Sequence, residues 1–303
     1  MIKTFIEKHA GIIFGAALLL GVLLPLNIQN ISSILMPLLI VLLYLSFLSV
    51  DLSHVKSELK RPLQLSIQVV WNFLIIPGAI FLILRQLGFT HFATAAMLLA
   101  AMPAGLASPV LTSIAGGRVA TSVVLTIVTH ILVPLSVPLL FWLFADVDVN
   151  VDVASLSKKM TLLIGIPIIL AFISRMFLKK VVQSTKNYHK ITSILAIAII
   201  AYLVITPHAE TIRSDFLSVV PMLIGSYSLF ALLCVTSFAL SRKRKPDEQA
   251  ALVITRVYMN NALAIVLAFQ FFSPEVTLIT ILAEIPWFTT FGAYLWFQKR
   301  FIL

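Results

Sequence analysis

Ten long apolar runs are the feature that most constrains how this chain of 303 residues folds. Most of them approach the 17–25 residues that a membrane-spanning helix needs. Hydrophobic residues make up 60% of the chain and charged residues only 11%, against about 25% charged in soluble proteins. The sequence therefore predicts an all-α polytopic membrane protein with one transmembrane domain over residues 1–303. The runs lie at about 10–26, 31–50, 63–84, 93–115, 119–144, 160–178, 191–206, 216–240, 249–272 and 276–297.

The longest break between runs, at 145–159, divides the chain into two sets of five predicted helices, 10–144 and 160–297. Because five is an odd number, two similar sets must cross the membrane in opposite directions. The spacing of the runs matches between the sets: the third and fourth begin near 63 and 93, and their counterparts near 216 and 249. We therefore expect two inverted five-helix repeats.

Basic residues in the short connections predict the orientation, because Lys and Arg concentrate on the cytoplasmic side of membrane proteins. Four of the 22 basic residues fall on the other side (Arg85, Lys158, Lys159 and Arg213), and Arg256 lies inside a run. We expect both termini in the cytoplasm and the protein in a plasma membrane, the inner membrane of a bacterium. The cytoplasmic set is Lys3, Lys8, Lys56, Lys60, Arg61, Arg118, Arg175, Lys179, Lys180, Lys186, Lys190, Arg242 to Lys245, Lys299 and Arg300.

The fourth run of each set is interrupted. The first, MPAGLASPVLTSIAGG, contains Pro103, Gly105 and Pro109, which remove backbone donors or loosen a helix. The second, EQAALVITRVYMNNALAIVLAFQFF, contains Arg256, Asn260 and Asn261. Matched interruptions in two halves of a chain indicate the midplane site of a secondary transporter. The alternative is that Pro and Gly are simply common in membrane helices.

Polar residues gather at the depth of Arg256, which we place about 10 Å inside the cytoplasmic end of its run. Thr126, on one helical face with Ser122 and Thr129, reaches about the same depth. Ser108 on the fourth run lies within one turn of that level. These residues predict a polar site around Arg256. The alternative for each hydroxyl is a bond to the carbonyl four residues earlier in its own helix.

Three further polar residues lie within the runs. Asn72 sits in the middle of the third, where an interhelical hydrogen bond is the alternative to a functional role. His130 is either a satisfied packing residue or a proton carrier. Glu284 falls within about 8 Å of Arg256 in depth. We expect the two to pair, either statically or as a pair that opens when a substrate or proton arrives.

These residues give the chain a resemblance to the bile acid:sodium symporter family. PAGLASPVLTSIAGGRVATSVVLTIVTHILVPLSVPLL (103–140) is close to its P-G-G-x-x-S-N segment and the Ser/Thr-rich helix that follows. YMNNALAIVLA (258–268) resembles the G-M-Q-N-x-x-L-A run of the family. YLSFLSVDLS (44–53) resembles G-x-x-L-x-x-x-D without the glycine. The resemblance covers nearly the whole chain.

The resemblance implies ten helices, of which the fourth and ninth are broken and cross each other in a core domain. It also implies that the substrate is held between this core domain and a second group of helices. It also implies sodium sites made by the fourth-helix break, fifth-helix hydroxyls and an acidic residue. Ser108, Ser122 and Thr126 match this set, and Asn261 matches the asparagine of the ninth helix. The chain departs from the family's pattern at four positions. Pro109 stands where the family has an asparagine, Asn260 and Asn72 stand where it has glutamines, and Arg256 stands where it has the acidic residue.

Arginine cannot coordinate a cation, because its side chain has only donors and stays charged. We therefore expect no sodium site of the family's kind, no other metal and no cofactor. Our hypothesis is that the Arg256 guanidinium replaces the cation and that the protein transports a small organic anion by alternating access. Coupling to sodium, or to a proton through Glu284 or His130, stays open as the alternative.

Other classes of function fit less well. No aspartate-rich pair lies on a predicted helix, no His-rich cluster occurs, and no Ser-His pair has an orienting acid, so nothing indicates a membrane-embedded enzyme. An arsenite carrier of related architecture would need a cysteine near the fourth-helix break, and the one cysteine is Cys234. The net charge of +10 comes without a nucleic-acid-binding motif. A sensor that does not transport remains possible, and the sequence predicts no oligomeric state.

Overall fold

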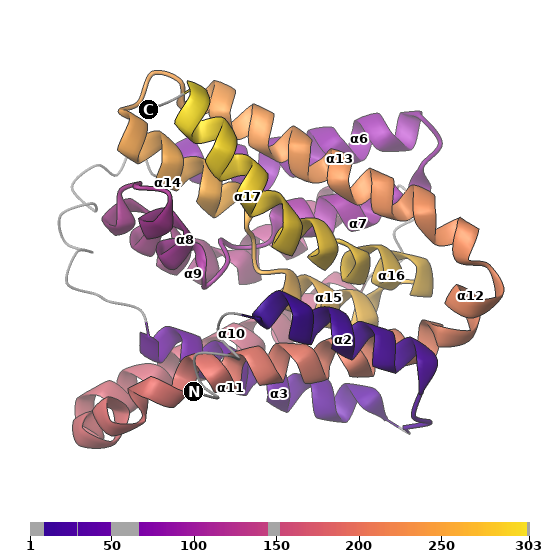
Figure 1. The fold of residues 1–303 in the computed structure, drawn as a ribbon, viewed down its shortest axis with the longest axis horizontal. Helices are drawn as coiled ribbons and strands as arrows, with labels where there is room; N and C mark the ends of the chain where they lie inside the picture. Colours follow the sequence, from indigo (N-terminus) through magenta and orange to yellow (C-terminus); the bar gives the residue numbers. More distant parts are fainter. Residues whose placement is uncertain (1–8, 29, 50–66, 145–151, 302–303) are drawn as a thin grey trace.

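The computed structural model describes residues 9–28, 30–49, 67–144 and 152–301, and these are helical without any strand (Figure 1). A π-helical turn, η1 (Trp71–Ile75), precedes α6, and a 3₁₀ turn, η2 (Thr206–His208), precedes α12. The α-helices are α2 (Ala10–Leu23), α3 (Ile31–Ser49), α6 (Ile76–Gln86), α7 (Thr90–Ala101), α8 (Ser108–Ile114), α9 (Val119–Leu143), α10 (Val153–Phe177), α11 (Lys179–Ile205), α12 (Ala209–Ser214), α13 (Phe216–Ser241), α14 (Pro246–Val257), α15 (Asn261–Phe271), α16 (Pro274–Leu282) and α17 (Glu284–Phe301).

Seven helical segments of the described chain are long and apolar enough to cross a membrane. Three shorter apolar helices, α2, α7 and α15, fall on the first, fourth and ninth predicted runs. The protein is therefore an all-helical, multi-pass membrane protein, as the composition predicts. The seven segments are Ile31–Ser49, Ile67–Gln86, Val119–Leu143, Val153–Phe177, Tyr188–Ser214, Phe216–Ser241 and Pro274–Arg300.

Several helices differ from their predicted bounds. The seventh run was expected from 191, but α11 begins at Lys179, directly after Leu178. The first half of α11 is polar, and it can still be helical because the part of a helix that lies outside the bilayer needs no apolar surface. The expected break at 145–159 ends early, because Asp152 caps α10 by accepting a hydrogen bond from the Ser155 N–H at 3.1 Å. Residues 145–151 lie outside the described chain.

Both interrupted runs are broken helices. The fourth separates into α7 and α8, with Pro103 and Gly105 in the connection. We expected Pro109 to contribute to the interruption, but it lies in the first turn of α8, where a proline costs no helical hydrogen bond. The ninth run separates into α14 and α15, and Asn260 caps α15 by accepting from the Leu263 N–H at 3.2 Å.

The helices form two groups that face each other. In the first, α3 packs on α10 and α11, and α2 packs on α11. Figure 1 shows α2, α3 and α11 along one side of the molecule. The second group contains the broken helices, with α8 and α14 on α9, and α16 on α7 and α15. Because α15 contacts both α3 and α11, the break in the ninth run lies where the groups meet.

Three connecting segments meet through polar contacts at one end of the second group. Arg118, before α9, forms a 3.0 Å salt bridge with Asp247 in the first turn of α14. Gln298, near the end of α17, donates to the carbonyl oxygen of Ala115 at 2.7 Å. These contacts place the α8–α9 turn, the start of α14 and the end of α17 together. The predicted cytoplasmic residues Lys3, Lys8, Lys56, Lys60 and Arg61 lie outside the described residues, as do residues 50–53 of the motif at 44–53.

Candidate functional site

The two helix breaks cross and pair through their backbones. The N–H of Gly105 donates to the Tyr258 carbonyl oxygen at 2.8 Å, and the N–H of Asn260 donates to the Pro103 carbonyl oxygen at 2.8 Å. Between them, Ala104 and Met259 form an antiparallel bridge. The pairing satisfies backbone groups that would otherwise be buried without partners. Gly105 is required here, because a Cβ atom would collide with the Tyr258 carbonyl oxygen.

Three neighbouring helices complete the hydrogen bonds of the crossing. From α8, Ser108 Oγ donates to the Tyr258 carbonyl oxygen at 3.1 Å. From α9, Thr129 Oγ1 accepts from the Ala104 N–H at 3.1 Å. From α17, Trp287 Nε1 donates to the Met259 carbonyl oxygen at 3.0 Å. The crossing is therefore held on several sides by hydrogen bonds from α8, α9 and α17.

Arg256 is buried beside the crossing, with 4% of its surface exposed. Its Nη1 donates to the Ala100 carbonyl oxygen, in the last turn of α7. The carboxyl end of a helix carries unsatisfied carbonyl groups and a partial negative charge. Nε and Nη2 are buried without a hydrogen-bond partner in the structure. The guanidinium therefore acts as a positive cap on α7.

The expected Arg256–Glu284 pair does not form. Arg256 points to α7, whereas Glu284 begins α17 and lines a cavity that Arg256 does not line. The prediction used only the depth of each residue in the membrane. Two residues at a similar depth can still point in different directions within the membrane plane, and these two do. Glu284 has no hydrogen bond or ion pair with any described residue, and it is 4% exposed.

His130 is held in a continuous hydrogen-bond chain with Asn260. Since a carbonyl only accepts, Nδ1 of His130 must donate to the Thr126 carbonyl oxygen at 2.7 Å. Nε2 of the neutral ring then accepts from Asn260 Nδ2 at 3.1 Å. The Oδ1 atom of Asn260 accepts from the Leu263 N–H, which fixes the orientation of the amide. Both ring nitrogens of His130 are therefore engaged.

The other predicted residues are spread around the crossing. Thr126 Oγ1 donates to the Ser122 carbonyl oxygen at 2.8 Å, within its own helix. Ser122 Oγ is buried without a partner. Asn72 is half-buried in the π-helical turn η1, which packs against α7 and α9. None of these three residues lines the cavity.

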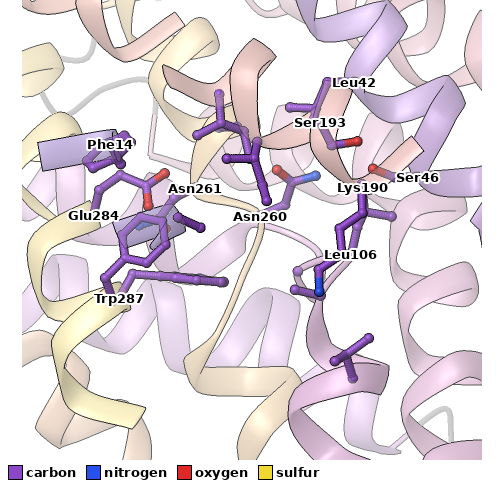
Figure 2. Close-up of a pocket in the computed structure, with 18 of the residues that line it drawn as sticks. Phe14, Leu42, Ser46, Leu106, Lys190, Ser193, Asn260, Asn261, Glu284 and Trp287 are labelled. Carbon is purple, nitrogen blue, oxygen red and sulfur yellow. The ribbon is translucent and has the colours of Figure 1, made fainter. Parts of the chain in front are cut away.

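A cavity of about 370 Å³ lies between the two helix groups (Figure 2). Its lining is mostly apolar. The two breaks contribute Gly105 to Ala107 and Met259 to Ala262, so Asn260 and Asn261 line it, as does Glu284. The remaining lining residues come from α2, α3, α8, α11 and α17: Ala10, Phe14, Leu42, Ser46, Ser49, Val110, Lys190, Ser193, Ile194, Ile197, Trp287 and Phe288.

The sequence analysis missed most of these lining residues, although helical spacing connects them. Lys190, Ser193, Ile194 and Ile197 stand at i, i+3, i+4 and i+7 on α11, which defines one face of a helix. We did not recognise this helical spacing in the sequence because Lys190 lies in a segment that we expected to be a cytoplasmic loop.

One end of the cavity combines polar and aromatic side chains. Asn261 is 3% exposed, and neither atom of its amide has a hydrogen-bond partner. In Figure 2 it lies next to Glu284, with Phe14 and Trp287 nearby. The ring of Phe288 is 5.2 Å from that of Phe14 and 5.0 Å from that of Trp287, between centroids. Across the described residues, no group of three His, Cys, Asp or Glu side chains could hold a metal ion.

Comparison with known proteins matches residues 36–215 to the model of the Sodium Bile acid symporter family. The chain is 28% identical over 277 residues to the uncharacterized sodium-dependent transporter YocS of Bacillus subtilis, covering 89% of this chain and 85% of that protein. It is 25% identical over 251 residues to the probable sodium/metabolite cotransporter BASS1, chloroplastic, of Oryza sativa subsp. japonica, covering 82% of this chain and 61% of that protein. These proteins are transporters rather than enzymes, and the chain itself belongs to the sodium bile acid symporter family of membrane transporters.

Proposed function

We propose that the protein transports a small organic anion by alternating access, with the substrate in the cavity between the two helix groups. The observation that carries this proposal is the meeting of both helix breaks at that cavity. Broken helices at membrane depth are tolerated where they line a cavity, and in secondary transporters they form the substrate site.

The proposed architecture is a ten-helix inverted repeat, 10–144 and 160–297. Its support is the antiparallel pairing of Ala104 with Met259, one from each fourth-place run. Two elements related by a two-fold axis in the membrane plane meet in this antiparallel way. The clustering of Arg118, the start of α14 and the end of α17 at one end supports an orientation with both termini in the cytoplasm of a bacterial cell.

Positive electrostatic features favour an anionic substrate. The amino-terminal end of α15, which carries a partial positive charge, reaches the cavity at Asn261 and Ala262. Lys190 lines the cavity from α11. The largely apolar remainder favours a substrate with a hydrophobic body.

The cavity also indicates which way the structure is open. Ala10 begins α2 and Ser49 ends α3, and both line the cavity together with Lys190. In the sequence, Ala10 and Ser49 stand next to basic connections that we expect on the cytoplasmic side. We infer a state that is open toward the cytoplasm, which movement of α2, α3 and α11 against the crossing would close.

Arg256 takes the place of a bound cation in this proposal. A sodium ion about 4 Å from the guanidinium would meet about 4 kcal/mol of repulsion at an effective dielectric constant of 20. The cap on Ala100 already supplies positive charge at the carboxyl end of α7. Both relatives are named for sodium dependence or sodium cotransport, and Arg256 is the residue at which we expect this chain to differ.

Purified protein in proteoliposomes tests the proposal. Taurocholate, pantoate and 4-methyl-2-oxopentanoate serve as probes, each with sodium and with potassium at equal ionic strength. We expect saturable uptake of at least one anion, at the same rate in both salts. Binding without flux would instead identify a sensor, and the absence of both binding and flux for organic anions would refute the proposed substrate class.

A further inference from the structure

We propose that Glu284 binds the coupling proton, so that each monovalent anion crosses the membrane together with one proton. This inference deepens the proposed function and depends on it for the nature of the substrate. It rests on the position of the buried Glu284 in the lining of the cavity, on the side opposite Lys190 and beside the unpartnered amide of Asn261 (Figure 2).

Glu284 has the environment of a functional carboxyl group rather than that of a structural ion pair. It is buried within the protein, lines the cavity and has no hydrogen-bonding or ionic partner among the described residues. An unpaired buried charge is costly, whereas a protonated carboxyl group is tolerated in an apolar cavity. Its neighbours Phe14, Trp287 and Phe288 supply such surroundings.

Few charged groups face Glu284 from the elements around it. From α11, Lys190 lines the cavity, but Figure 2 shows it on the far side from Glu284. The lining residues of α2, α3 and α15 are not ionisable. On α14, Arg256 is turned to Ala100. On α16, which precedes Glu284, Glu275 is exposed at the opposite end of the helix. The ionisable groups of α13, Tyr227 and Cys234, do not line the cavity.

His130, the other candidate proton carrier, fits this role less well. Its Nδ1 donates to Thr126, and its Nε2 accepts from Asn260. A second proton would require the Asn260 amide to turn and would break its cap on α15. Glu284 can take a proton without losing any hydrogen bond.

Proton binding follows from the proposed anionic substrate. An anion at the amino-terminal end of α15 would lie beside Glu284, and two negative charges there repel each other strongly in an apolar cavity. A proton from the aqueous phase converts the carboxylate to a carboxyl group, which can donate a hydrogen bond to the anion. Anion and proton then leave together on the other side, and the carboxylate is regenerated. One proton per monovalent anion makes the transport step electroneutral.

Taurocholate is the transport probe, because its sulfonate stays ionised and does not cross a bilayer as a neutral acid. A pH difference of one unit, acidic outside, should drive an accumulation ratio of about ten in wild-type proteoliposomes. An imposed membrane potential should leave that ratio unchanged. Glu284→Gln, which resembles the protonated carboxyl group, should keep taurocholate exchange but reduce the ratio to about one. The matched control Glu275→Gln should keep the tenfold ratio.

A second measurement needs no transported substrate. Infrared difference spectra of the purified protein between acidic and alkaline pH should contain a carboxylic-acid band that Glu284→Gln removes and Glu275→Gln retains. If wild-type protein moves no anion, the proposed function fails, and this band still decides whether Glu284 binds a proton. Proton-driven accumulation that survives in Glu284→Gln, or a band that this variant does not remove, would overturn the assignment.

Discussion

The backbone N–H of Gly105 donates to the Tyr258 carbonyl oxygen at 2.8 Å, and this bond joins the breaks of two helices from opposite halves of the chain. The approach leaves no room for a side chain at residue 105. Gly105→Ala should therefore force the breaks apart and lower the free energy of unfolding by about 1–3 kcal/mol. Thermal unfolding in detergent measures the loss, and transport should fall with it.

Gly165→Ala is the matched control for this substitution. Gly165 lies within α10, and an added Cβ atom there meets nothing within 4 Å. Since alanine is the better helix former by about 0.5–1 kcal/mol, this variant should be as stable as the wild type or more stable. Equal losses in both variants would contradict the special role of residue 105.

The adjacent residues Asn260 and Asn261 should respond differently to the same substitution. Asn260→Ala removes the cap on α15 and the bond to His130, and should cost about 1–2 kcal/mol of stability. Asn261→Ala removes no hydrogen bond and should leave the unfolding temperature nearly unchanged. It should instead weaken anion binding, because its amide lies in the cavity. Thermal unfolding and titration with taurocholate separate the two effects, and a reversed pattern would contradict the account.

The sequence predicted the helical membrane fold and the two broken helices because both depend on local chemistry: the length of the apolar runs, Pro103 and Gly105 in the fourth run, and the polar residues in the ninth. It did not predict the partner of Arg256. The depth of a residue in the membrane follows from its position along its helix. The direction of its side chain within the membrane plane depends instead on how the helices cross. The same limit explains the false Arg256–Glu284 pair. Lys190 was missed because its helix continues past the apolar run.

Lys190 should contribute to anion affinity. Lys190→Gln removes a positive charge from the lining of the cavity and should weaken taurocholate binding about fivefold, or about 1 kcal/mol for a charge pair near water. Lys186→Gln, four residues earlier on α11, changes an exposed charge that does not line the cavity and should have little effect. Equal dissociation constants for the wild type and Lys190→Gln would exclude a direct role.

The salt bridge between Arg118 and Asp247 should give a small, pH-dependent stabilisation. Burial by itself raises the pKa of Asp247, but the Arg118 side chain, backbone N–H groups and the Arg118 charge together lower the pKa below its usual value. A lowered folded-state pKa stabilises the protein above the unfolded-state pKa, and the stabilisation is lost as pH falls through the folded-state value. Because the pair is partly exposed, Asp247→Asn should cost less than about 1 kcal/mol at neutral pH and nothing in strong acid.

The central claim is that Arg256 replaces a bound cation at the carboxyl end of α7. Its most direct test is the thermal unfolding of wild type and Arg256→Glu in sodium chloride and potassium chloride at equal ionic strength. We expect the wild type to unfold at the same temperature in both salts. Arg256→Glu should be less stable in potassium and should be stabilised specifically by sodium. A sodium-specific rise in the unfolding temperature of the wild type would contradict the claim.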